Sequence, residues 1–228
     1  MMTDVIGRRR LLRGAAAIST LALLPGCAAG LPGSGGLAAV LRDLLTLSSQ
    51  RAFARLLTDD GFLNDDLVRL GLPPELTGSG GLLATLLSTP LVQNQLLALV
   101  NDAAGVAADA AVPVIDDTIR SLTFADAAAV LRGGPQAATG VLQRALGNTL
   151  ADRLAPSALL GLREGQGDIL SRVMGAATGY DVNRLAANVG QQASQSIFRA
   201  IGREEAYLRA NPQETNNPAL IAALSVLS

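Results

Sequence analysis

The chain has 228 residues, of which 49% are hydrophobic and only 3% aromatic, and its formal net charge is −1. Its basic residues are all arginines and it has no histidine, so the commonest general base and metal ligand is missing. Leucine and alanine dominate the apolar residues, which favours helices over sheets, and the length suits one domain. No basic run follows the first residues, so we expect no nucleic-acid partner, and no motif predicts a metal or cofactor.

Residues 1–26 have the layout of a secretory signal peptide. A basic stretch precedes an apolar run at residues 15–24, which is about half of the roughly 20 residues needed to span a bilayer. The stretch resembles a twin-arginine export motif, carried by Arg8, Arg9, Leu11 and Leu12. We therefore predict export from the cytoplasm.

Leu24-Pro25-Gly26-Cys27 resembles the lipobox of a bacterial lipoprotein, in which the peptide is cut before a cysteine whose thiol carries a diacylglycerol. Such acyl chains contribute roughly 0.8 kcal/mol per buried CH₂. Pro25 is unusual in a lipobox, and the alternative is an uncleaved N-terminus with an incidental cysteine. Ala28, in place of aspartate, favours the outer membrane by analogy with lipoprotein sorting. We expect a lipid anchor on the periplasmic face, followed by a flexible tether over residues 27–36.

From residue 37 onward, apolar residues at steps of three and four predict a single all-α domain of about eight helices. The first helix is expected over residues 37–57, and a second over 82–111 with a break near Pro90. Pro113 should start a new helix or kink an existing one. Thr123 should cap a short helix through a capping box, and Gly133 should end it.

In the second half, a helix is expected from Pro135 through residue 155, and Pro156 should begin another segment. Asp181 should cap a long helix that runs toward Leu208, where a proline stop follows. A last short apolar helix is expected over residues 218–227.

Four carboxylates lie around a turn signal and invite a calcium interpretation: Asp59, Asp60, Asp65 and Asp66. They lack the alternating ligands and the glutamate at the twelfth position that an EF-hand loop needs. We favour solvated turn and cap residues.

A second acidic group consists of Asp102, Asp109 and Asp116, which recur every seven residues. They share one helix face if the axis runs straight through Pro113, and such a row suits a cation or a basic partner. A solvated face is the favoured interpretation.

We predict no catalytic residues and no enzyme. The chain has no Gly-x-Ser-x-Gly elbow, and Gly133-Gly134-Pro135 lacks the lysine of a phosphate loop. Glu204 and Glu205 are a formal pair for carboxylate chemistry, but neighbouring helical residues point about 100° apart. As exposed acids, Asp59, Asp60, Glu204 and Glu205 are instead predicted to face a partner.

Several motifs, in this order over about residues 38–225, resemble the bacterial domain family of unknown function DUF4197. The matching segments are 60–64 with 72–74, then 107–113, 122–127 with 131–134 and 137–139, and finally Glu204-Glu205 with Arg209 and Asn211-Pro212. The chain departs from the pattern at Gly140-Val141, where similar proteins carry aromatics, and at Gly105, where a polar residue is common.

This resemblance implies an exported, often lipid-anchored, all-α protein and brings no activity with it. We therefore expect a non-catalytic binding or scaffolding role toward an envelope protein. The alternative is a carrier that encloses a lipid or other apolar ligand among its leucine-rich helices. The many alanines and glycines fit either close helix packing or open space.

Overall fold

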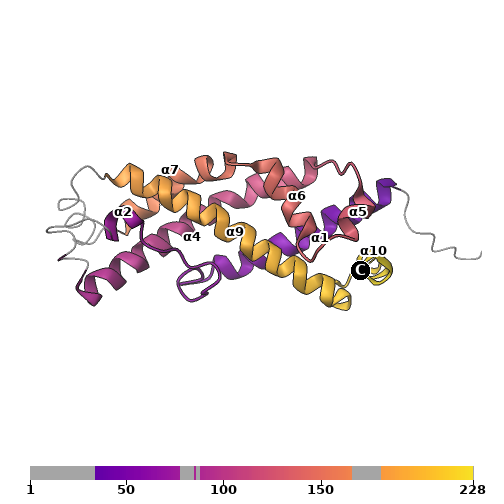
Figure 1. The fold of residues 1–228 in the computed structure, drawn as a ribbon, viewed down its shortest axis with the longest axis horizontal. Coiled ribbons are helices and arrows are strands. Elements are labelled where there is room, and N and C mark those ends of the chain that lie inside the picture. The colour runs from indigo at the N-terminus through magenta and orange to yellow at the C-terminus, as the bar shows by residue number, and fades with distance from the viewer. Residues whose placement is uncertain (1–33, 78–84, 86–87, 166–180, 228) are drawn as a thin grey trace, which may run out of the picture. The chain divides into compact units, whose positions relative to one another are not determined.

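The computed structural model describes residues 34–77, 85, 88–165 and 181–227, and every regular element in these ranges is a helix, which confirms the all-α class (Figure 1). The elements are α1 (Ser34–Leu56), α2 (Pro74–Thr77), α4 (Pro90–Ser121), α5 (Ala127–Leu131), α6 (Ala137–Leu146), α7 (Thr149–Glu164), α9 (Val182–Ala210), the 3-10 helix η1 (Pro212–Thr215) and α10 (Pro218–Leu227). The predicted signal peptide with Arg8, Arg9, Leu11 and Leu12, and the predicted lipidation site Cys27, lie outside the described residues.

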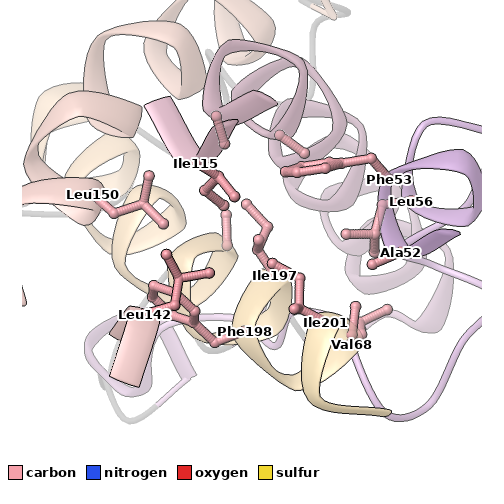
Figure 2. Packing of buried hydrophobic residues seen from close by; sticks show 14 of the residues in the cluster. Ala52, Phe53, Leu56, Val68, Ile115, Leu142, Leu150, Ile197, Phe198 and Ile201 are labelled. Carbon is pink, nitrogen blue, oxygen red and sulfur yellow. The ribbon is translucent and has the colours of Figure 1, made fainter. Parts of the chain in front are cut away.

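Helix α9 holds the domain together, because it packs against α7, α1, α4 and α6 (Figure 1). Its apolar residues recur at helical spacing, and those that face the core, from Leu185 to Leu208, are buried. Figure 2 shows where the helices converge, with labelled side chains that include Phe53 and Leu56 from α1, Ile115 from α4, Leu142 from α6, Leu150 from α7, and Ile197, Phe198 and Ile201 from α9.

Small residues bring the main helices into close contact. A Cβ atom at Gly161 of α7 would lie 2.8 Å from the Cα of Ala103 in α4. On the other side of α7, a Cβ atom at Gly190 of α9 would lie 2.9 Å from the carbonyl oxygen of Ala151. At these seams the alanines and glycines therefore serve close packing and leave no space.

Helix α4 continues through Pro113, so the new helix that could have started there is wrong, and Pro113 lies inside an existing helix as in the other expected case. A proline in a helix interior removes one hydrogen bond, and the contacts of α4 with α1, α7 and α9 outweigh that loss. By length and composition alone, α4 could also cross a membrane. Half of the residues in the most apolar stretch of α4 are buried inside the domain, as in a core helix.

The short helix after α4 begins later than expected. Asp126, and not Thr123, is its N-cap, because the Asp126 carboxylate accepts a 2.8 Å hydrogen bond from the backbone N–H of Ala129. The expected end at Gly133 is confirmed, since α5 stops at Leu131.

The break predicted at Pro156 is also wrong, because α7 continues through it. The true break comes earlier, at Gly147, whose φ of 52° is a left-handed conformation that ends α6. Asp181 caps α9 as predicted, accepting from the N–H of Arg184 at 2.8 Å, and α10 has the predicted bounds.

Candidate functional site

The segment that follows α1, residues 57–73, which we call the α1–α2 loop, begins with a tight turn. Thr58 donates its hydroxyl to the Arg55 carbonyl at 2.7 Å, and the Gly61 N–H donates to the Thr58 carbonyl at 2.9 Å. Asp60 between them has a φ of 55°, a conformation that aspartate tolerates. A Cβ atom at Gly61 would lie 2.5 Å from the Arg55 carbonyl oxygen, so the turn requires glycine there.

Two side-chain amides fix the far end of this loop. Asn101 of α4 accepts from the N–H of Leu70 at 2.8 Å and donates to its carbonyl at 3.2 Å. Gln192 of α9 makes the same pair of bonds with Gly71, each 3.0 Å long. Each carboxamide thus pairs with one residue's backbone as a neighbouring strand would. The loop is held from both sides without a sheet.

Asp65 ties the middle of the loop to α9. Its Oδ2 lies 2.6 Å from Nη1 of Arg203, and its Oδ1 accepts from the N–H of Leu67 at 3.0 Å. Partial burial raises the pKa of Asp65, but the Arg203 hydrogen bond, the Leu67 hydrogen bond and the charges of Arg203 and Arg55 outweigh it, so that the pKa is lowered overall. Asp65 is therefore a charged residue that holds the loop on α9.

A cleft of about 480 Å³ lies between the turn of the α1–α2 loop and α4, and we call it the acidic cleft. The loop contributes Asp59 and Asp60, and α4 contributes Asp102 and Asp109 from one face of its uninterrupted helix. Gly105 lies between the two α4 carboxylates along the helix, and a Cβ atom there would meet no other atom within 4 Å. The structure thus brings members of both predicted acidic groups together, whereas Asp65, Asp66 and Asp116 do not line the cleft.

No described residue forms an ion pair that neutralises the negative charge of the acidic cleft. Within the described ranges, none of its four aspartates forms an ion pair. Partial burial, and then the neighbouring charge of Asp60, raise the pKa of Asp102. Two apolar side chains at the rim, Leu57 and Val106, are 43% and 38% exposed. The cleft therefore offers uncompensated negative charge beside apolar surface.

The four carboxylates surround the cleft and do not converge on one point. In the part of the chain that the structure describes, no group of three or more Asp, Glu, His or Cys side chains could hold a metal ion. The arrangement suits an extended cationic group, because each carboxylate can be reached separately.

The exposure expected for Glu205 is wrong, because this side chain is fully buried. Its carboxylate accepts hydrogen bonds from the N–H groups of Ala138 at 3.0 Å and Thr139 at 2.7 Å, and from the Thr139 hydroxyl at 2.6 Å. Arg209 donates to it at 2.8 Å and also to the Leu131 carbonyl at 2.7 Å. One ion pair on α9 thus caps the N-terminus of α6 and the C-terminus of α5.

Glu204 is also buried, with only 1% of its surface exposed, so its predicted exposure is wrong as well. Its Oε1 lies 3.3 Å from Nη1 of Arg55 and 3.8 Å from Nε of Arg203, whereas its Oε2 has no hydrogen-bond partner among the described residues. Glu204 and Glu205 point to different neighbours, as expected of adjacent helical residues. Neither contributes to an exposed partner surface.

The two departures from the family pattern each line a hollow of the surface. Gly105 lines the acidic cleft, and Gly140 lines a second cleft of about 250 Å³ between α6 and α9. At both positions glycine leaves room that a larger side chain would occupy.

The comparisons with known proteins point to one family. A family model described as "Protein of unknown function (DUF4197)" matches residues 33–224, which is nearly the whole chain. No curated protein and no solved structure matches the chain. The matched range includes the α1–α2 loop, α4 and the Glu205–Arg209 pair.

Proposed function

Since the chain belongs to the DUF4197 family of unknown function, we propose from its site that it is an exported, lipid-anchored binding protein without catalytic activity. The observation that carries this proposal is the acidic cleft, whose walls are fixed by Asn101, Gln192 and the Asp65–Arg203 pair. A preformed cleft loses little conformational freedom when a ligand binds.

The proposed ligand is a basic segment of another envelope protein. Arginine or lysine side chains would neutralise Asp59, Asp60, Asp102 and Asp109, and the apolar part of the segment would cover the rim formed by Leu57 and Val106. The carrier alternative receives no comparable support, because the helices pack closely against each other at Gly161 and Gly190 and leave no space for a ligand there.

Binding can be tested with a fluorescent peptide of alternating lysine and leucine and the purified lipoprotein, by anisotropy at several salt concentrations. The double variant Asp60→Asn/Asp102→Asn should bind the peptide about fivefold more weakly, because two surface charges together contribute on the order of 1 kcal/mol. The affinity of the wild type should also fall with added salt.

The matched control is Asp117→Asn/Asp152→Asn, which makes the same change in net charge at exposed positions of α4 and α7 outside the acidic cleft. Equal losses of affinity in the two double variants would mean that the peptide responds only to overall charge. In that case the cleft would not be the binding site.

The anchor is tested separately, by feeding cells a clickable fatty acid. The wild type should take up the label and fractionate with the outer membrane, and Cys27→Ala should do neither, because the acyl chains attach through the Cys27 thiol. If neither protein took up the label, the anchor and the proposed location would be lost, while the cleft experiment would still stand.

A further inference from the structure

The last helix, α10, is almost entirely apolar, and its one polar side chain, Ser225, is exposed. Its ten residues include no charged side chain. Leu220, Ala223 and Leu224 are buried against the domain, whereas Ala222 and Val226 on the outer side are exposed, Val226 by 64%. A helix with so few polar residues is normally covered on every side. Among the residues that the structure describes, none covers the outer side of α10, which is apolar apart from Ser225.

This helix lies against the half of α1 that is nearest to the proposed anchor. It packs on α1 and α5 (Figure 1). Asn217, just before α10, donates its side-chain amide to the Asp43 carboxylate at 3.3 Å. Asp43 is nine residues into α1 from Ser34, which corresponds to about 14 Å along the helix axis. Thus α10 begins close to the point where the tether enters the domain.

The tether is too short to place this end of the domain far from the bilayer. Cys27 precedes Ser34 by seven residues, and a chain extends by at most about 3.6 Å per residue. Whatever path the residues take, Ser34 therefore lies within about 25 Å of a lipid attached to Cys27. The other end of α1, at Leu56 beside the acidic cleft, lies about 33 Å further along its axis.

We propose that the outer side of α10, with Ala222 and Val226 at its centre, rests on the surface of the lipid bilayer. The proposal rests on the lipid anchor proposed above. The exposed apolar area is too small to hold a free protein on a membrane, but the tether gives the helix a high local concentration at the bilayer. No charge on α10 has to lose its hydration when the helix reaches the acyl chains.

This contact would orient the molecule. With α10 against the bilayer, the acidic cleft lies toward the opposite end of α1 and is accessible from the periplasm. Docking of α10 and binding at the cleft would therefore not compete for the same surface.

The test uses the full lipoprotein purified from cells and reconstituted into vesicles of phosphatidylethanolamine and phosphatidylglycerol. A thiol-reactive, polarity-sensitive fluorophore is attached at Val226→Cys, at Leu160→Cys on α7 and at Gly105→Cys in the acidic cleft. Leu160 is the matched control, because it is also an exposed apolar side chain, at 55%. The parent chain reports the anchor, since a lipidated Cys27 has no free thiol to label.

We expect a blue shift and several-fold stronger quenching by nitroxide lipids at position 226 than at positions 160 and 105. Ala222→Glu placed beside the probe should abolish both effects while the circular dichroism of the protein stays unchanged. If position 226 behaved like position 160 in a parent that takes no label, the docking would be wrong and the anchor would stand.

Two further outcomes also decide against the proposal. Labelling of the parent at Cys27 would remove the anchor and the docking with it. Protection of position 226 in detergent as well as in vesicles would show that a second copy or another protein covers α10, and this would overturn the bilayer as its partner.

Discussion

Glu205 and Arg209 form an ion pair whose two side chains are buried and each bond to a helix end. The carboxylate replaces a missing N-cap: Gln136, at the cap position of α6, makes no side-chain bond to the helix. The guanidinium occupies the acceptors at the end of α5. Their charges also match the helix dipoles, negative at an N-terminus and positive at a C-terminus.

Glu205→Gln should lower the free energy of unfolding by about 3–5 kcal/mol, because it leaves Arg209 buried without a counter-charge. Urea denaturation of the lipoprotein measures this change. The control is Glu214→Gln, which alters an exposed carboxylate 4.0 Å from Arg51 and should cost no more than about 1 kcal/mol. Similar losses in both variants would refute the role given to the buried pair.

Asp102, in contrast, carries a charge that lowers the stability of the fold. Its pKa is raised from the ordinary value of 3.8 by partial burial and by Asp60. A carboxyl group whose folded pKa is raised binds its proton more tightly in the folded state. Asp102 therefore contributes favourably to the free energy of unfolding below pH 3.8, and this contribution is lost as the pH rises through the folded pKa.

Asp102→Asn should consequently be more stable than the wild type at pH 7, by about a few tenths of a kcal/mol, and should bind the basic peptide more weakly. Thermal unfolding across a pH series measures the first effect, and the difference should disappear toward pH 3. A variant that is less stable than the wild type at pH 7 would contradict the charge crowding inferred for the cleft.

At the scale of elements, glycine acts in two different ways on helices α4 and α7. A side chain at Gly161 would collide with α4, whereas one at Gly105 would extend into the open cleft. Gly161→Ala should therefore destabilise the domain by about 1–3 kcal/mol through overpacking, and Gly105→Ala should stabilise it by roughly 0.5–1 kcal/mol through helix propensity. Chemical denaturation of both variants checks the opposite signs, and equal effects would contradict the packing of this seam.

The elements themselves could largely be predicted from the spacing of apolar residues, and the errors come from single local signals. Pro113 was expected to start or kink a helix and Pro156 to begin a new segment, but α4 and α7 continue through these prolines, and tertiary contacts hold both helices together. Thr123 and Asp126 both suit an N-cap, and local sequence did not distinguish between them. Gly147-Asn148 is also a typical helix-ending pair, and α6 ends there.

The site was less predictable than the fold because distant residues create it. The turn at Asp59 and Asp60 and the row of Asp102 and Asp109 could be seen separately in the sequence. Their meeting depends on Asn101, which holds a residue 31 positions away, and on Gln192, which reaches 121 positions back. Two adjacent glutamates near a helix end also suggest solvent exposure, and nothing local indicates that α6 covers Glu205.

For the whole molecule, the proposed location depends on the sequence signals before residue 34, and the proposed binding surface belongs to the described domain. Arg8→Lys/Arg9→Lys should leave an uncleaved precursor in the cytoplasm, because the paired arginines are the feature that export through the twin-arginine route requires. Cell fractionation and immunoblotting detect the precursor. Normal export of this variant would show that another route carries the protein, without affecting the fold.

The shared ion pair at the ends of α5 and α6 has a consequence for local motion. If Glu205 and Arg209 separate, the end of one helix and the start of the other lose their bonds together. Amide hydrogens of both short helices should then exchange with deuterium in a single cooperative opening, at a lower free energy than those of α9.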